Sequence, residues 1–78
     1  MKSWKFEDHA IQIRGLEHGQ PHVHVITPDH EASMLISDGE VIVGDVPLKI
    51  EKKARQWVVK NKKKLMGLWA KSTAARTK

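Results

Sequence analysis

The hydrophobic period of the chain changes at Gly44, and this change limits the possible folds more than any other feature. Before Gly44, apolar residues alternate with polar ones in short runs, which is typical of strands that bury one face. After Gly44, apolar residues recur every three or four positions, which is typical of an amphipathic helix. The sequence therefore predicts an α+β fold in which the strands come first and a helix follows.

Four strands are predicted before Gly44, over residues 10–14, 21–26, 32–37 and 40–43. Asp38-Gly39 is a strong hairpin signal, and the other connections are also short and turn-like. We therefore expect a four-stranded antiparallel meander.

Strand alternation divides the side chains between two faces of this sheet. The core face receives Ile11, Ile13, Val23, Val25, Met34, Ile36, Val41 and Val43. The open face receives Gln12, Arg14, His22, His24, Ser33, Leu35, Ser37 and Ile42. Leu35 and Ile42 are expected to form a small exposed apolar patch, so a homodimer through the open sheet face is one expected assembly.

The helix is predicted to follow an Asp45 cap, with Pro47 in its first turn. Its apolar stripe contains Ile50, Ala54, Trp57, Val58, Leu65, Leu68 and Trp69. Asn61 lies on the same stripe, and it either continues one long helix or caps a second one after a bend. We expect a single domain over residues 3–72 and a basic, disordered tail over residues 73–78.

Length and composition exclude several classes of protein. The 78 residues contain no cysteine, which removes disulfides and thiolate metal sites. No apolar run has the length of a membrane span, and the first residues do not resemble a secretory signal. We therefore expect a cytoplasmic protein without membrane contact.

Charge is divided unevenly along the chain. Residues 1–48 contain three basic and eight acidic residues, a net charge of −5, whereas residues 49–78 contain eleven basic residues and one acidic residue, a net charge of +10. Five lysines are separated by 4, 7, 4 and 7 positions, which places them in one line on a continuous helix: Lys49, Lys53, Lys60, Lys64 and Lys71. This line predicts contact with an acidic protein partner or with the backbone of RNA or DNA. The alternative is a solvated helix whose lysines attract the acidic half of the same molecule.

His22 and His24 stand one residue apart in the second predicted strand and therefore share a face. Three interpretations are open. In the first, the histidines serve the structure or an interface, by bonding backbone groups or by lining a dimer or partner contact. In the second, they act as acid and base of a metal-independent ribonuclease, with Arg14 holding the phosphate. In the third, they bind a metal together with His18. Further metal ligands considered are Glu17, His9 and His30. We favour the first interpretation, with no metal and no cofactor.

The order of these segments resembles the family called domain of unknown function 4160, which consists of small bacterial proteins. The resemblance covers roughly residues 9–70, and its most specific part is the segment Glu17-His18-Gly19-Gln20-Pro21-His22-Val23-His24-Val25. Three further parts carry it: Ile11-Gln12-Ile13, the residues 39–47 and the helical residues 61–69. Gln20 and Val23 depart from a Pro and a Phe in the family pattern. The family has no settled biochemical function, and its members resemble components of toxin–antitoxin-like two-gene pairs. We therefore expect a non-enzymatic interaction module, with the ribonuclease and the metal-binding module as alternatives.

Overall fold

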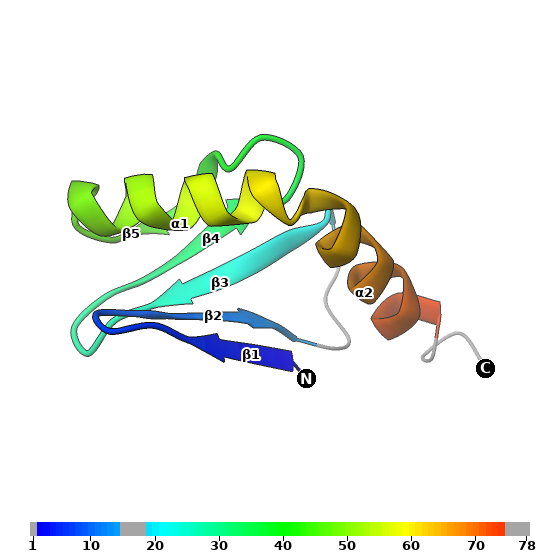
Figure 1. Cartoon of the computed structure of the whole chain (residues 1–78), viewed down its shortest axis with the longest axis horizontal. Helices are drawn as coiled ribbons and strands as arrows, with labels where there is room; N and C mark the ends of the chain where they lie inside the picture. The colour runs from blue at the N-terminus through cyan, green and yellow to red at the C-terminus, as the bar shows by residue number, and fades with distance from the viewer. Residues whose placement is uncertain (1, 15–18, 75–78) are drawn as a thin grey trace.

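Five strands come first and two helices follow in the computed structural model, which describes residues 2–14 and 19–74 (Figure 1). The strands are β1 Lys2–Lys5, β2 Ala10–Ile13, β3 His22–Ile26, β4 Glu31–Leu35 and β5 Val41–Asp45. The helices are α1 Leu48–Lys60 and α2 Lys62–Ala74. The prediction of an α+β fold with an antiparallel sheet is confirmed.

The strands form one sheet in the order β1-β2-β3-β4-β5, and each pairs antiparallel with its neighbours in the chain. The prediction of four strands is wrong, because β1 is an additional edge strand that pairs Lys2 with Ile13 and Lys5 with Ala10. β1 has four residues and one large apolar side chain, Trp4, so its sequence shows no alternating pattern. Its position is fixed by the β2 ladder and by the packing of Trp4 against the core.

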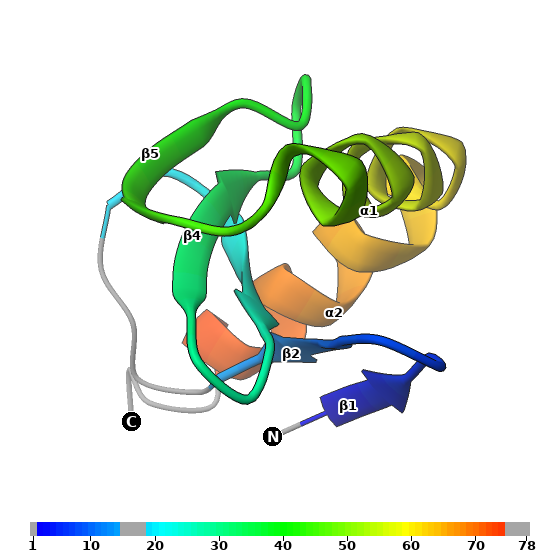
Figure 2. The same cartoon turned by 90° about the vertical axis from the view of Figure 1, so that its left-hand side faces the viewer.

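The sheet curves around the two helices, and its inner face forms the core (Figure 2). Side chains from three strands and from both helices are completely covered, among them Ile11, Val25, Met34, Val58 and Leu65. The predicted core face is therefore confirmed from β2 to β4. Burial of these side chains is the main favourable contribution to folding in a chain of this size.

Two assignments near the β4–β5 hairpin are wrong. Val43 was expected in the core but is 65% exposed, and Leu35 was expected on the surface but is only 8% exposed. The pairing shifts between Ser33, which lies opposite Val43, and Met34, which lies opposite Val41. Ile42 is therefore an extra residue, a β-bulge, which turns Val43 to the outer face of the sheet.

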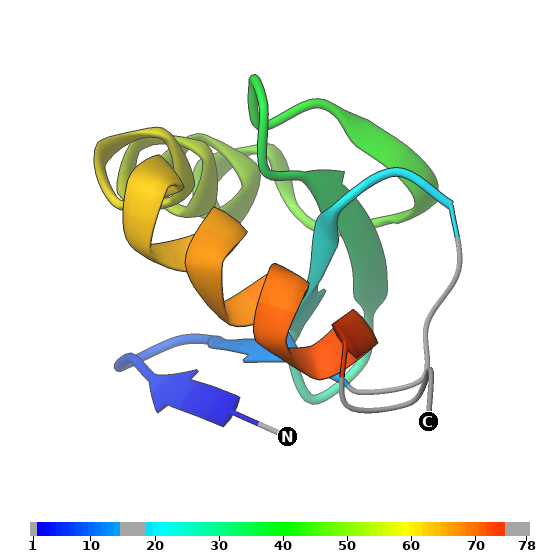
Figure 3. The same cartoon turned by 90° about the vertical axis from the view of Figure 1, so that its right-hand side faces the viewer.

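The helical segment is bent at Asn61, so the prediction of one long helix is wrong and the predicted bend is correct. The Asn61 backbone N–H and its side-chain Nδ2 both donate to the Trp57 carbonyl, at 3.0 and 2.8 Å. The Leu65 N–H then donates to the Asn61 carbonyl at 2.9 Å within the new helix. Asn61 thus provides hydrogen-bond donors for a carbonyl group at the end of α1. α2 then runs in a new direction across the end of the sheet where β3 begins (Figure 3).

The first helix begins later than the sequence suggests. Asp45 belongs to β5 and does not cap the helix, which starts at Leu48 after Pro47. The tail expected over residues 73–78 lies largely outside the described residues, and α2 includes its first two positions.

Candidate functional site

His22 and His24 lie on the outer side of β3, opposite to Val23 and Val25, and their rings touch. The ring centroids are 5.2 Å apart in an edge-on arrangement, and each residue is only 8% exposed. The His22 Nδ1 lies 2.8 Å from the Gln20 carbonyl oxygen. The structure thus brings the two predicted histidines together but leaves little of either ring accessible.

His22 also links the sheet to the second helix. Its ring packs against the Trp69 ring with a centroid distance of 4.9 Å. The sequence assigned Trp69 to the apolar stripe of one helix, whereas in the structure Trp69 contacts His22 from α2, after the chain has bent at Asn61. This contact and the bond to Gln20 favour a structural use of His22.

A chain of polar contacts runs from β2 to His24 across the outer face of the sheet. The Arg14 Nη1 donates to the Glu31 Oε2 at 3.1 Å, and the same oxygen lies 3.3 Å from the His24 Nδ1. The Arg14 Nε also donates to the Gln12 Oε1 at 3.2 Å. Arg14 lies near His24, as the ribonuclease interpretation requires, but its guanidinium already binds two side chains.

Glu31 is the member of this chain that sequence reasoning missed. The third strand was predicted from Ala32, whereas β4 begins at Glu31, opposite Ile26. Extending the alternation by one residue places Glu31 on the face of Ser33. The alternation of the strand, extended by one residue, could therefore have identified Glu31 as a neighbour of the histidine face.

Metal-binding groups are not assembled by the described residues. Within residues 2–14 and 19–74, no three His, Asp or Glu side chains converge in a way that can hold an ion. His18 and Glu17, which the metal interpretation invoked, lie outside the described residues. His30 lies exposed in the β3–β4 turn, and His9 is bound to Asp8.

The five predicted lysines are all exposed, but they do not form one straight line. Lys49, Lys53 and Lys60 belong to α1, whereas Lys64 and Lys71 belong to α2, whose direction differs because of the bend (Figure 1). Four exposed lysines flank Asn61 at the bend. We call the four lysines there the elbow lysines: Lys60, Lys62, Lys63 and Lys64.

Lys53 differs from the elbow lysines because it is already paired. Its Nζ lies 2.9 Å from the Asp8 Oδ2, and the other Asp8 oxygen lies 2.6 Å from the His9 Nδ1. The hydrogen bond from Lys53, followed by that from His9, lowers the pKa of the Asp8 carboxyl from 3.8 to about 2. This pair agrees with the alternative in which lysines attract the acidic half of the same chain.

A pH titration should reveal this pair. Folding lowers the pKa of Asp8, so between about pH 4 and pH 2 the unfolded chain binds a proton that the folded chain does not. Stability from this carboxylate is therefore complete above pH 4 and is lost as the pH falls towards 2. We expect urea unfolding midpoints of Asp8→Asn to depend less on pH in this window than those of the wild type. Asp29→Asn, which removes an exposed carboxylate in the β3–β4 turn, should retain the wild-type slope; identical slopes for Asp8→Asn and the wild type would contradict the pairing.

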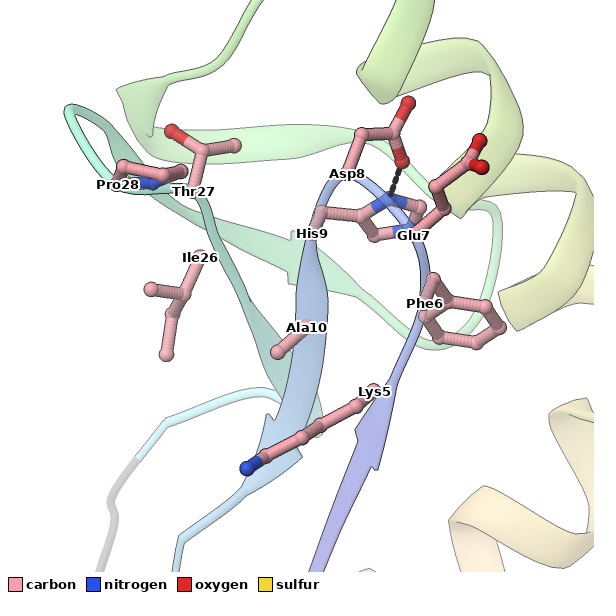
Figure 4. A pocket seen from close by; sticks show the side chains of 9 residues that line it. All are labelled: Lys5, Phe6, Glu7, Asp8, His9, Ala10, Ile26, Thr27 and Pro28. Atoms are coloured by element: carbon pink, nitrogen blue, oxygen red, sulfur yellow. Dashed lines mark hydrogen bonds and ion pairs between the residues drawn. The ribbon is translucent and has the colours of Figure 1, made fainter.

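An open hollow of about 410 Å³ lies beside this pair, at the β1–β2 and β3–β4 turns. Its lining consists of Lys5, Phe6, Glu7, Asp8, His9, Ala10, Ile26, Thr27 and Pro28. The Lys5, Ala10 and Ile26 side chains point to one side of the sheet, and the Phe6 and His9 rings point to the other side (Figure 4). The lining groups therefore do not converge on one point.

Arg55 is the other cation of α1 with identified partners. Its Nε donates to the Gly39 carbonyl at 3.0 Å, and its Nη2 donates to Glu51 at 2.6 Å. These contacts tie the β4–β5 hairpin to α1. Arg55 is therefore a structural residue rather than a free surface charge.

No helix in the described part of the chain is long and apolar enough to cross a membrane.

A protein-family model matches most of the chain. The model of the family called domain of unknown function (DUF4160) matches residues 11–70. The chain belongs to this family. The match includes the histidine strand, the bulged hairpin, α1 and most of α2, whereas β1 lies before it. Neither the comparison with curated proteins nor that with solved structures gives a match.

Proposed function

We propose that this DUF4160 protein is a non-enzymatic module that binds the phosphate backbone of a nucleic acid through the elbow lysines. Four exposed lysines within five residues carry this proposal. Within the described residues, none of the four forms an ion pair, whereas Lys53 and Arg55 do. Four unneutralised cations on one bend repel one another, and an anionic partner relieves this repulsion.

The histidine face supports binding rather than catalysis. A general acid and a general base must reach the substrate within hydrogen-bond distance. His22 and His24 are each 8% exposed, and Arg14 is engaged by Glu31 and Gln12. A phosphodiester would have to displace these contacts before either imidazole could act on it.

Salt dependence tests this proposal. Each phosphate that a lysine neutralises releases counterions and contributes about 0.7 to 0.9 to the slope of log K against log salt concentration. We expect the triple variant Lys60→Gln/Lys63→Gln/Lys64→Gln to reduce the magnitude of this slope by about 2, so that binding depends less on salt. The slope is measured by fluorescence anisotropy with labelled RNA and DNA. Exposed lysines add little to stability, so the thermal unfolding midpoint should change only slightly.

The matched control removes three lysines away from the bend: Lys49→Gln/Lys52→Gln/Lys71→Gln. It changes the net charge equally, so it separates a local site from diffuse attraction. We expect it to lower the slope by less than half as much. Equal slopes for the two triple variants would mean that the elbow is not a site.

A protein partner is the second candidate, and the edge strand β5 favours it. β5 exposes Ile42 and Val43, and Leu48 follows at the start of α1, with exposures of 48%, 65% and 64%. The opposite edge strand, β1, carries Lys2 and Lys5, which discourage strand addition, whereas β5 carries no lysine. Failure to bind RNA or DNA, together with co-purification of one acidic protein, would favour a toxin–antitoxin-like pair over the nucleic-acid proposal.

A further inference from the structure

Three aromatic rings form a seam between β1 and α1. The Trp4 ring lies 5.2 Å from the Trp57 ring, and the Phe6 ring lies 5.5 Å from Trp57 in an edge-on arrangement, as measured between ring centroids. We call these three residues the aromatic seam. All three are only partly buried, whereas the core residues Ile11 and Leu65 are completely covered.

Lysines flank this seam on both elements. Lys53 and Lys60 stand four residues before and three residues after Trp57, on the same stripe of α1. Lys2 stands two residues before Trp4 in β1 and therefore shares its face. β1 and α1 border the same side of the molecule (Figures 2 and 3), and the partly buried rings of the aromatic seam retain some exposed surface there.

The cations of this border are not equivalent. Lys53 is bound to Asp8. Lys2 and Lys60 are exposed and form no ion pair with the residues that the structure describes. Lys60 also belongs to the elbow lysines, so the aromatic seam and the proposed phosphate site are continuous.

We infer that the aromatic seam stacks the bases of a single-stranded nucleic acid while Lys2 and Lys60 contact its phosphates. This inference rests on the proposed function and names its substrate class. Aromatic side chains beside a cationic track are the usual means of binding single strands, because every base has a stacking face. A duplex keeps its bases paired and stacked inside, so it can reach the lysines but not the rings.

The experiment uses the full chain and two fluorescently labelled probes of about 12 nucleotides, oligothymidylate and its duplex with oligoadenylate. We expect Trp4→Leu to weaken binding of the single strand about tenfold and to leave duplex binding nearly unchanged. Trp4→Phe retains a ring and should restore most of the single-strand affinity. Thermal unfolding of both variants establishes that each is folded at the temperature of the titration.

Intrinsic tryptophan fluorescence gives a second measurement of base stacking, with variants that keep an aromatic ring at the replaced position. Base stacking quenches tryptophan, so oligothymidylate should quench the wild type and Trp69→Phe similarly. Trp4→Phe should be quenched less, because the replaced ring belongs to the aromatic seam.

Different failures have different meanings. Equal losses for single strand and duplex in Trp4→Leu, or unchanged single-strand affinity, would overturn the stacking inference and leave the elbow proposal standing. Absence of binding by the wild type to both probes at low salt would overturn both proposals. Loss of an acidic protein partner in Trp4→Leu, without any nucleic-acid binding, would assign the aromatic seam to protein contact and would also overturn the inference.

Discussion

Replacing Gly44 by alanine is expected to destabilise the protein by roughly 3 kcal/mol. Gly44 has φ of +73°, a conformation that costs other residues about 1–2 kcal/mol. A Cβ atom there would also collide with the backbone oxygen of Glu31, which cannot move without breaking the β4–β5 ladder. A domain this small has little stability to lose, so urea unfolding followed by circular dichroism should show a large shift of the midpoint.

Two other glycines separate the causes of this effect. Gly19 has φ of +91°, but a Cβ there meets no atom of the described residues within 4 Å, so Gly19→Ala should cost only the conformational part. Gly67 lies in α2 with similar open space, and Gly67→Ala should stabilise the helix by about 0.5–1 kcal/mol. If Gly44→Ala costs no more than Gly19→Ala, the close approach of Gly44 to Glu31 is not important for stability.

The alternation of residues 10–36 was sufficient to predict three strands, their order and their buried face. This works because each strand has one covered face, and because short turns permit only neighbouring antiparallel pairs. β1 could not be found in the same way, since Trp4 is its one large apolar residue. Trp4 pairs with Ile11 in the neighbouring strand β2, but its ring contact with Trp57 in α1 is a distant one that no local pattern encodes.

The bulge at Ile42 explains why the core face was wrong in the last strand. A prediction from alternation assumes that the pairing register between the two strands is unbroken. One extra residue reverses the faces after it, which moved Val43 outward. The Asp38-Gly39 signal identified the hairpin but not the register of its second strand.

The histidine pair was correctly placed on one face, but its surroundings were not predictable. Strand pairing brings Glu31 to His24 and Arg14 to Glu31, and the bend at Asn61 precedes the helix whose Trp69 contacts His22. The lysine spacing likewise predicted exposure correctly, whereas the predicted line of five lysines is broken because α2 runs in a different direction from α1. The shared face of the histidines and the exposure of the lysines were therefore predictable from the sequence. The contacts between side chains of different elements were not.

Truncation of Trp69 is expected to have an effect at least as large as that of Gly44→Ala. Trp69 is 8% exposed, packs with the core and touches His22, and removal of a large buried aromatic side chain costs about 3–5 kcal/mol. Because Trp69 joins α2 to the start of β3, we expect Trp69→Ala to release α2 before the sheet unfolds. Hydrogen exchange should then show early loss of protection in residues 65–71, with slower loss in β2 and β3.

Leu68→Ala is the matched control for this prediction, because Leu68 is the preceding residue of α2 and is only partly buried. It should cost about 1–2 kcal/mol and leave the exchange pattern of α2 close to that of the sheet. The lysines of α2 keep their charge in both variants, so the affinity for nucleic acid should fall in Trp69→Ala only if the elbow requires a docked α2. Equal destabilisation by Trp69→Ala and Leu68→Ala would mean that the Trp69–His22 contact does not hold the second helix, and that α2 is anchored mainly by Leu65, which is completely buried.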